Sequence, residues 1–259
     1  MISVTDINKS FRENQVLYNV STIFERGKTN LIIGQSGSGK TVLLKCIIGL
    51  HEADSGEIEY DGKNIYALDT KSRQLLRQEI GMLFQGGALF DSLTVEENIQ
   101  FPLDMFTNLT KKEKLNRVNF CLDKVHLAEA NDLFPAELSG GMQKRVAIAR
   151  AIVLNPKYLF CDEPNSGLDP VTALVIDRLI SEITHEFNIT TIVNTHDMNS
   201  VLEIGEKIVF IYKGQKQWEG SNKEILSTDD EILNNFIFAS EFAKQLRNSA
   251  SEKNNNASK

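Results

Sequence analysis

The chain has 259 residues, of which 41% are apolar, so it can form a sizeable hydrophobic core and is not a wholly disordered protein. Its net charge is −7, and the basic residues are scattered apart from short clusters such as Lys111–Lys112. Without an extended basic stripe, binding to nucleic acid is not expected.

The first part of the chain contains a strand, a glycine-rich turn and a helix in direct succession. An apolar strand is expected at 30–34, followed by GQSGSGKT at 34–41 and by the apolar helical stretch VLLKCIIGL. Further on, residues 56–65 alternate in polarity around Asp61 and Gly62, a dipeptide that is typical of hairpins. The chain should therefore contain an antiparallel β element beside its other strands.

A long helical region comes next and is followed by further strands. The stretches TVEENIQF, TKKEKLNRVNFCLDKV and GGMQKRVAIARAIVL have helical spacing and place a helical subdomain at about 88–152. Three more strands are expected at 157–163, 189–196 and 207–214. Because several strands are followed by helices, we predict an α/β fold with a mainly parallel sheet, an antiparallel β subdomain and an inserted helical subdomain.

The last part of the chain is predicted to be a helical extension and a polar tail. Apolar residues recur at helical spacing from Ile232 to Ala243, so we expect a helix within 227–248. This helix would pack on its own domain, or it would dock on a second subunit or a small regulator. Residues 249–259 have too few apolar side chains to pack and are expected to be disordered.

The cysteines and the apolar runs indicate a cellular compartment. Cys46, Cys121 and Cys161 are far apart in apolar surroundings, and their spacing fits neither a metal site nor a disulfide framework. We expect three buried thiols in a reducing cytoplasm. No signal-peptide pattern opens the chain, and its apolar runs are far shorter than the ~18 residues that cross a bilayer. Any role at a membrane would need a partner protein.

The segment GQSGSGKT matches the phosphate-binding pattern G-x-x-x-x-G-K-[ST] between a predicted strand and a predicted helix. Its residues are Gly34, Gln35, Ser36, Gly37, Ser38, Gly39, Lys40 and Thr41. The glycines allow backbone N–H groups to surround phosphate oxygens, and the helix N-terminus adds a favourable dipole. Lys40 would reach the β- and γ-phosphates of a nucleotide, and Thr41 would bind Mg²⁺. The alternative is an ordinary glycine-rich turn.

The strand at 157–163 ends in two carboxylates, Asp162 and Glu163. At a nucleotide site Asp162 would bind Mg²⁺ through water, and Glu163 would be the general base for the attacking water. Such a pair can also be no more than the start of a loop. His196 follows another strand and is a candidate for polarising the γ-phosphate, whereas the other three histidines lie in polar contexts and are expected at the surface.

The stretch LSGGMQKRVAIARAI at 138–152 places a Ser-Gly-Gly turn at the start of a strongly periodic helix. The N-terminus of that helix, at Ser139, Gly140 and Gly141, is a second phosphate cradle. A single γ-phosphate needs only one P-loop. We therefore expect a composite site in which residues 34–41 of one subunit face this turn of another.

Together these motifs resemble those of ATP-binding cassette (ABC) ATPases. They occur in that family's order: the P-loop, Gln85, LSGGM at 138–142, the acidic strand, SGLD at 166–169 and His196. The resemblance covers about residues 1–226, which would form the ABC ATPase domain around a P-loop nucleoside triphosphatase core. It implies an active ATPase that uses ATP and Mg²⁺ and works as a homodimer.

The resemblance also implies roles for residues outside the clearest motifs. Phe11 would stack on adenine, although a core aromatic residue in an edge strand is the alternative. Asp169 would bridge to the P-loop of the partner subunit. Gln85 would touch Mg²⁺ or the attacking water when the helical subdomain swings inward. The departures from the family pattern are Phe11, Met142, Asn165 and Asn194.

The stretch FQGGALFDSLTVEENIQFPL contains no groups arranged for catalysis, but its glycine pair supplies a hinge after the glutamine. In the transporter family this region receives a short cytoplasmic helix of the permease. We therefore expect a permease to dock near Gly86–Leu103. Leu89 and Phe90 should then be partly exposed in the free subunit, and the alternative is that Phe90 belongs to the core.

Within the family, this stretch, ELSGGMQKRVAIARAI and THDMNSVLEIGEKIVFIYKG are similar to the ATPase subunit of Mla-type (maintenance of lipid asymmetry) phospholipid transporters. The similarity implies movement of phospholipid between the inner and outer membranes of a bacterial envelope. It places the chain on the cytoplasmic face of the inner membrane. The implied partners are a separate permease, a periplasmic lipid-binding subunit and a small regulator. Residues from about 228 onward do not match the extension of that subunit.

Other readings of the cassette differ in cargo or in the class of machine. The same ATPase would serve a different cargo, such as an amino acid, an ion or a lipoprotein. ABC ATPases of chromosome maintenance or DNA repair usually carry a long coiled coil or a zinc insertion between P-loop and signature, and here only about a hundred residues intervene, without heptads or paired cysteines. A translation-factor cassette would contain two P-loops, and this chain contains one.

Overall fold

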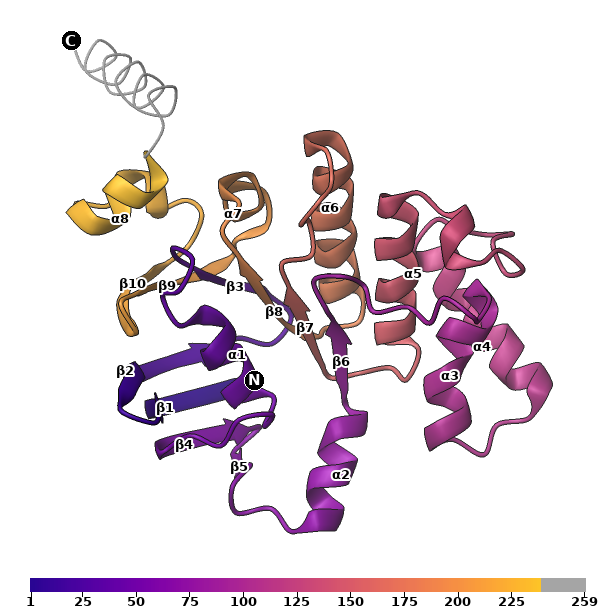
Figure 1. Ribbon diagram of the computed structural model, residues 1–259, viewed down its shortest axis with the longest axis horizontal. Helices are drawn as coiled ribbons and strands as arrows, with labels where there is room; N and C mark the ends of the chain where they lie inside the picture. The colour runs from indigo at the N-terminus through magenta and orange to yellow at the C-terminus, as the bar shows by residue number, and fades with distance from the viewer. Residues whose placement is uncertain (239–259) are drawn as a thin grey trace.

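Two β-sheets and a set of helices make up the computed structural model, which describes residues 1–238 (Figure 1). The larger sheet has six strands in the order β10-β9-β3-β8-β7-β6. Their bounds are β3 (Thr29–Ile33), β6 (Ile80–Leu83), β7 (Tyr158–Asp162), β8 (Thr190–Thr195), β9 (Lys207–Tyr212) and β10 (Gln215–Gly220). All neighbours pair in parallel except β10 with β9. Every residue of β3 and β8 is buried, as expected for a parallel sheet that is covered on both faces.

The smaller sheet is antiparallel and has the strand order β2-β1-β4-β5. Its strands are β1 (Ile2–Phe11), β2 (Asn14–Phe24), β4 (Ser55–Tyr60) and β5 (Lys63–Asn64). The predicted hairpin is confirmed: Asp61 and Gly62 connect β4 to β5 with positive φ values of 48° and 79°, as a tight two-residue turn requires. Register shifts interrupt the pairing of β1 with β2. These irregularities break the alternation that would have identified both strands in the sequence.

Helices cover the larger sheet on both faces. Those beside the strands are α1 (Lys40–Ile47), α2 (Thr70–Gln78), α6 (Pro170–Glu186) and α7 (Met198–Ile204). The buried face of α1 packs with the smaller sheet and with Ile32, Phe160 and Ile192 of the larger one. The opposite face of the larger sheet, which includes Leu31 and Val193, packs against α5, α6 and α7. The P-loop helix and the helical region therefore lie on different faces of one sheet.

The predicted helical subdomain forms a group of helices beyond β6 and α6 (Figure 1). It contains α3 (Val95–Phe106), α4 (Lys111–Lys124), the 3-10 turn η1 (Pro135–Glu137) and α5 (Gly140–Ile152). Both α3 and α4 begin with a capping box, Thr94 with Glu97 and Thr110 with Glu113. The mixed α/β architecture predicted from the sequence is thus confirmed, including its antiparallel and helical parts.

The described part of the C-terminal extension packs on its own domain. It consists of the 3-10 turn η2 (Ile225–Ser227) and the helix α8 (Glu231–Ile237). Leu233 is fully buried, and the ring of Phe236 stacks on that of Phe210 with centroids 5.2 Å apart. The rest of the predicted helix, up to residue 248, and the tail 249–259 lie outside the described residues. In residues 1–238 no helix has the length and apolar character that spanning a membrane requires.

The three cysteines are buried and unpaired, as predicted. Burial raises the pKa of the Cys46 and Cys121 thiols to about 11, and it raises the pKa of Cys161 further. All three thiols stay protonated at neutral pH and act as small apolar core residues.

Candidate nucleotide-binding site

The glycine-rich turn 34–41 connects β3 to α1 at the carboxyl edge of the larger sheet. Gly39, the N-cap of α1, has a φ of 106°, in the left-handed region that favours glycine. A side chain at Gly34 would place its Cβ 2.2 Å from the carbonyl oxygen of Ile211. The turn therefore requires glycine at both positions. Because no side chain caps α1, its first backbone N–H groups are available to an anion.

Lys40, the first residue of α1, is buried and folds back over this turn. Its Nζ donates hydrogen bonds to the carbonyl oxygens of Gly34 (2.8 Å) and Gln35 (3.1 Å). Burial lowers the pKa of the Lys40 ammonium, and the negative charges of Glu163 and Asp162 act in the opposite direction. The ammonium group thus lies inside the phosphate-binding turn and within the field of the two carboxylates.

Glu163 follows β7 and is held by the neighbouring strand β8. Its φ of 49° is one that glutamate rarely adopts, and its backbone N–H donates to the carbonyl oxygen of Asn194 at 2.9 Å. The carboxylate oxygen Oε1 lies 2.9 Å from Nδ1 of His196. The exposed fraction of the side chain is 17% for Glu163 and 67% for His196. The predicted general base is thus inside the site and contacts a histidine at its rim.

Thr41 and Asp162, the first two predicted Mg²⁺ ligands, are connected through Asn194. The Asn194 Nδ2 donates to Oδ1 of Asp162 at 2.5 Å and to Oγ1 of Thr41 at 3.3 Å. The sheet register explains this contact, since Asp162 at the end of β7 pairs directly with Asn194 of β8. A hydroxyl and a carboxylate oxygen are both ligands that Mg²⁺ accepts.

The chemistry of these residues fits a nucleotide together with Mg²⁺. Within residues 1–238 no group of three or more His, Cys, Asp or Glu side chains is arranged to hold a metal. A Mg²⁺ ion at Thr41 and Asp162 would therefore take its other ligands from phosphates and water, which is its usual coordination at nucleotide sites. The uncapped helix N-terminus and the buried ammonium are the groups that such phosphates need.

Gln85, the third predicted metal ligand, follows β6 and contacts the loop after the carboxylates. Its Nε2 donates to Oγ of Ser166 at 3.1 Å. Its backbone carbonyl accepts a hydrogen bond from Lys144, and the carbonyl of Gly87 accepts one from Arg150 at 2.7 Å. Because Lys144 and Arg150 belong to α5, the helical subdomain holds the glutamine loop directly.

The second predicted phosphate cradle, at the start of α5, makes different contacts. Ser139 caps its own helix by accepting from the backbone N–H of Met142 at 3.3 Å. A Cβ at Gly141 would lie 2.5 Å from the methyl group of Thr172, so α5 packs closely on α6 here. Asp169 caps α6, and its hydrogen bond from the hydroxyl of Thr172 lowers the pKa of the Asp169 carboxyl. The contacts given for Ser139 and Gly141 thus lie within α5 and against α6, and among the described residues none of them is with Lys40.

Phe11 lies at the end of β1, away from both cradles in the sequence. Its side chain is 42% exposed, which excludes the alternative of a core aromatic residue. The ring centroid of Phe11 is 5.3 Å from that of His51, in an edge-on arrangement, and 5.4 Å from the Nζ of Lys9. The ring is accessible, and its stacking on adenine stays a prediction.

Motif matching missed the contacts of two asparagines. Besides the bridge made by Asn194, Asn165 donates through Nδ2 to Oδ1 of Asp177 (2.8 Å) and to Oγ of Ser200 (3.0 Å). Asp177 is completely buried in α6, and burial raises its pKa to about 6. The sequence signal that could have found these contacts is the presence of a polar asparagine, at 165 and at 194, beside a catalytic motif where an apolar residue would pack. These contacts join segments that are distant in the sequence, so no local pattern identifies them.

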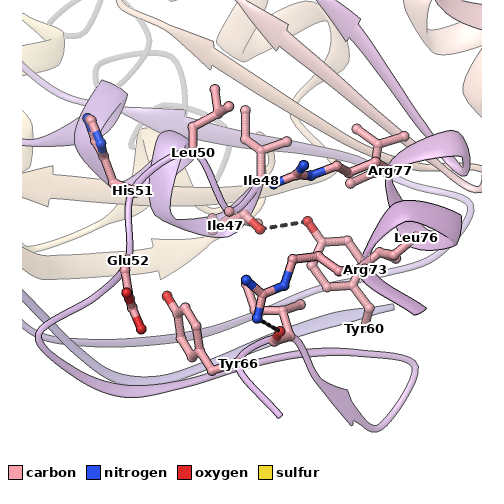
Figure 2. A pocket seen from close by; sticks show the side chains of 13 residues that line it. Ile47, Ile48, Leu50, His51, Glu52, Tyr60, Tyr66, Arg73, Leu76 and Arg77 are labelled. Carbon is pink, nitrogen blue, oxygen red and sulfur yellow. Dashed lines mark hydrogen bonds between the residues drawn. The ribbon is translucent and has the colours of Figure 1, made fainter. Parts of the chain in front are cut away.

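A separate hollow of about 240 Å³ lies at the other end of α1 (Figure 2). It is lined by Ile48 and Leu50 from the end of α1 and the turn after it, and by Arg73 and Arg77 of α2. None of the predicted site residues lines this hollow. The hollow is therefore separate from the phosphate-binding turn, although His51, which also lines it, contacts the ring of Phe11.

Comparison with known proteins finds a family model that matches more than half of the chain. A family model described as "ABC transporter" matches residues 17–166. The chain is 39% identical over 237 residues to the methionine import ATP-binding protein MetN of Clostridioides difficile, which covers 92% of this chain and 74% of that protein. It is 34% identical over 236 residues to the probable ribonucleotide transport ATP-binding protein mkl of Mycobacterium bovis, which covers 91% and 66%.

Two solved structures are similar in fold as well as in sequence. The ATP-binding cassette MJ0796, a dimer in a post-hydrolysis state with ADP and Pi, matches with a TM-score of 0.77 and 32% identity over 86% of this chain and 99% of that one. The protein cbiO1 of Clostridium perfringens, part of the transporter complex cbiONQ, matches with a TM-score of 0.83 and 29% identity over 95% of this chain and 98% of that one.

Proposed function

This chain belongs to the ABC transporter family of ATPases, and from that premise we propose that it hydrolyses ATP to drive a separate membrane permease. The observation that carries the proposal is the cluster of Lys40, Asp162, Glu163 and His196 at one edge of the larger sheet. These groups supply a phosphate-binding cation, a metal ligand and a base in contact with a histidine. Such a set serves attack of water on a γ-phosphate.

Each residue has a distinct task in this reaction. Lys40 and the turn 34–41 would bind the phosphates, while Thr41 and Asp162 would hold Mg²⁺, which neutralises the charge that develops on the phosphate oxygens. Glu163 would accept the proton of the attacking water. His196, hydrogen-bonded to Glu163, would hold that carboxylate in orientation and face the γ-phosphate from the rim.

A second copy of the chain would complete the site. MJ0796, a relative with 32% identity, is a dimer with ADP and Pi. In this chain α1 and α5 cover opposite faces of the sheet, and Ser139 has its own helix as hydrogen-bond partner. We expect Ser139–Gly141 of one copy to bind the γ-phosphate held by Lys40 of the other. Asp169 would lie at the contact between the two copies and bridge to the P-loop of the partner subunit.

The helical subdomain would receive the permease on the cytoplasmic side of the membrane. Phe90 is 43% exposed and its ring centroid lies 4.9 Å from that of Phe101, which is also exposed. Leu89 is half-buried against the core beneath. These exposures agree with the prediction that Leu89 and Phe90 are partly exposed in the free subunit. The apolar side chains lie within Gly86–Leu103 and suit the apolar side of a short amphipathic helix.

An amino acid is the cargo that the relatives favour. MetN at 39% identity is named for methionine import and mkl at 34% for ribonucleotide transport, so the comparisons support a small solute better than phospholipid. The resemblance of residues 84–103 to Mla-type subunits keeps phospholipid as the second candidate. The periplasmic lipid-binding subunit belongs to that second candidate alone.

Reconstitution tests the function and distinguishes the cargoes. The chain and its operon-encoded permease would be purified together and placed in liposomes, with Lys40→Ala as the matched control. We expect ATP-dependent uptake of labelled methionine by the parent and none by the control. Transfer of a fluorescent phospholipid in place of methionine would select the second candidate. ATPase activity that is absent in the full complex and equal to the control would overturn the proposed function itself.

A further inference from the structure

The end of strand β8 contains a buried amide side chain, that of Asn194, beside the apolar core. Ile192, two residues earlier and on the same side of the strand, belongs to the core that also contains α1. Asn194 is itself completely buried. A valine or isoleucine would fill this position without bringing an amide into the core, so the choice of asparagine calls for a specific physical reason.

The amide of Asn194 has two of the three expected metal ligands, Asp162 and Thr41, as its hydrogen-bond acceptors. Nδ2 lies 2.5 Å from Oδ1 of Asp162 and 3.3 Å from Oγ1 of Thr41. The backbone carbonyl of the same residue accepts the N–H of Glu163 at 2.9 Å. One residue thus contacts the P-loop helix, the metal carboxylate and the general base.

The orientation of this amide is determined by its neighbours. An ionised carboxylate only accepts hydrogen bonds, so the atom of Asn194 that faces Asp162 must be the nitrogen. The oxygen of the same amide then points elsewhere, and it is buried without a hydrogen-bond partner. An unpaired buried acceptor lowers stability. The amide therefore fixes the positions of Asp162 and Thr41 at the cost of a buried oxygen without a hydrogen-bond partner.

We propose that Asn194 is a positioning residue for Mg²⁺. Its amide holds the Asp162 carboxylate and the Thr41 hydroxyl at the spacing that the ion requires. This inference rests on the proposed assignment of ATP and Mg²⁺ to the site. A carboxylate has lone pairs left for a metal or its water after it accepts one N–H, and a hydroxyl oxygen has a second lone pair. Residues that orient metal ligands in this way strengthen metal binding although they do not touch the ion.

The test is the Mg²⁺ dependence of nucleotide binding by the full chain. A fluorescent, non-hydrolysable ATP analogue would be titrated with Mg²⁺ in the parent and in Asn194→Val, and its binding would also be measured in EDTA. Loss of an orienting group typically weakens metal binding about 10–100-fold, so we expect the half-saturating Mg²⁺ concentration to rise by about tenfold or more. Binding in EDTA should change by less than about twofold, since Lys40 and the turn are untouched.

Thr190→Val is the matched control. Thr190 is on the same face of the same strand, is also buried, and also has a side-chain oxygen without a hydrogen-bond partner. The control should bind Mg²⁺ like the parent. Asn194→Ser, whose hydroxyl is too short to bridge the two ligands, is the second variant and should show the same loss as Asn194→Val.

The outcomes separate this inference from the proposed function. Half-saturation by Mg²⁺ at the parent's concentration in both variants would overturn the positioning role. An equal loss of binding in EDTA, or failure of both variants to fold, would also overturn it by assigning Asn194 to the structure of the site. A parent chain that binds neither the analogue nor Mg²⁺ would instead refute the assignment of ATP and Mg²⁺.

Discussion

Two helices of this molecule start at glycine-rich turns that suit a phosphate, and their surroundings differ. The start of α1 carries Lys40 and lies next to the carboxylates and histidine that end β7 and β8. The start of α5 carries Ser139, which is hydrogen-bonded only within its own helix among the described residues. In the proposed reaction the first region would supply the cation, the metal ligands and the base, and the second region would supply only a further contact for the γ-phosphate.

The positions of α1 and α5 explain why the two phosphate-binding turns have different surroundings. The core of α1 lies on one face of the larger sheet and that of α5 on the other, and Gly141 is wedged against Thr172 of α6. Under the proposed function, one chain thus contains most of the groups for catalysis at one edge of the sheet and, separately, a helix N-terminus that would serve the other copy. This division is what a site shared by two copies requires, and the following changes test each half.

The largest effect is expected from Glu163→Gln, which disables the first region and leaves the second intact. Loss of a general base commonly lowers a rate about 10²–10⁴-fold, and we expect such a fall in steady-state ATP hydrolysis. Binding of ATP should persist because Lys40 and its turn are unchanged, so a closed dimer should accumulate and elute earlier in size-exclusion chromatography with ATP. Hydrolysis at the parent's rate would show that another residue is the base.

A smaller effect is expected from Phe90→Asp, which alters the helical subdomain that carries the second region. Burial of one phenylalanine contributes roughly 1.5–3 kcal/mol, and a buried unpaired charge opposes docking further, so the permease should bind on the order of 100-fold more weakly. Co-purification with the permease measures this loss, while ATP binding by the free chain should be normal.

Ile23→Asp is the control for this experiment, since Ile23 has similar exposure but lies on β2 of the smaller sheet. It should co-purify like the parent. If Phe90→Asp still assembles and transports, the permease docks elsewhere. If it is insoluble or loses ATP binding, Phe90 belongs to the core of the subdomain.

The third test concerns the buried Asp177, which helps to connect the segments that follow Glu163 and His196. Its carboxylate accepts a hydrogen bond from Asn165, and Asn165 also donates to Ser200 of α7, the helix after His196. Burial raises the pKa of Asp177 from 3.8 to about 6, so between these values the folded chain binds a proton that the unfolded chain has released. The free energy of unfolding contributed by this group therefore falls as pH rises through that window.

Asp177→Asn removes the charge and keeps an oxygen that accepts from Asn165. We expect it to raise the free energy of unfolding at pH 8 by about 1–2 kcal/mol, within the ~3 kcal/mol that two pKa units allow, and to leave it unchanged at pH 4. Urea denaturation at both pH values measures the difference. Glu182→Gln, an exposed acid on the same helix, should show no such pH dependence. Equal stability of Asp177→Asn and the parent at both pH values would mean that the buried charge has no net cost.

The smallest effect is expected at the start of α5. Gly141→Ala would place a Cβ 2.5 Å from Thr172, whereas Gly140→Ala would place one 3.5 Å from Leu168, an ordinary contact. We expect Gly141→Ala to be less stable than Gly140→Ala by about 1 kcal/mol, at the lower end of the range for overpacked sites. Thr172→Ser, which removes the clashing methyl group, should restore stability to Gly141→Ala in thermal unfolding. Equal stability of the two alanine variants would show that α5 moves freely on α6.

The parts of the molecule that the sequence predicted are those with a local signal. The hairpin at Asp61 and Gly62 follows from a two-residue turn that needs positive φ, and the parallel strands follow from short apolar runs. The strands β1 and β2 escaped because their register shifts break the alternation of polar and apolar residues.

The site divides in the same way. Lys40, Thr41, Asp162 and Glu163 belong to motifs of a few adjacent residues, and the structure places them together. The bridge from Asn194 to Thr41 spans 153 positions and depends on strand register, which no local pattern contains. The identity of the cargo was the property that the sequence predicted least well. The motifs of an ATPase subunit serve contacts with nucleotide and permease, and they do not report what the permease binds. That is why the relatives, rather than the motifs, favour an amino acid over phospholipid.

The most direct test of the shared site combines two lesions in different chains. Both chains would carry Glu163→Gln to trap the closed dimer, one with Lys40→Ala and the other with Ser139→Arg. In the mixed pair both lesions fall in one site, and the other site keeps an intact Lys40 and an intact Ser139. We predict an ATP-dependent dimer in the mixture and in neither chain alone. A mixture that fails to dimerise, like each chain alone, would contradict a site built from two copies.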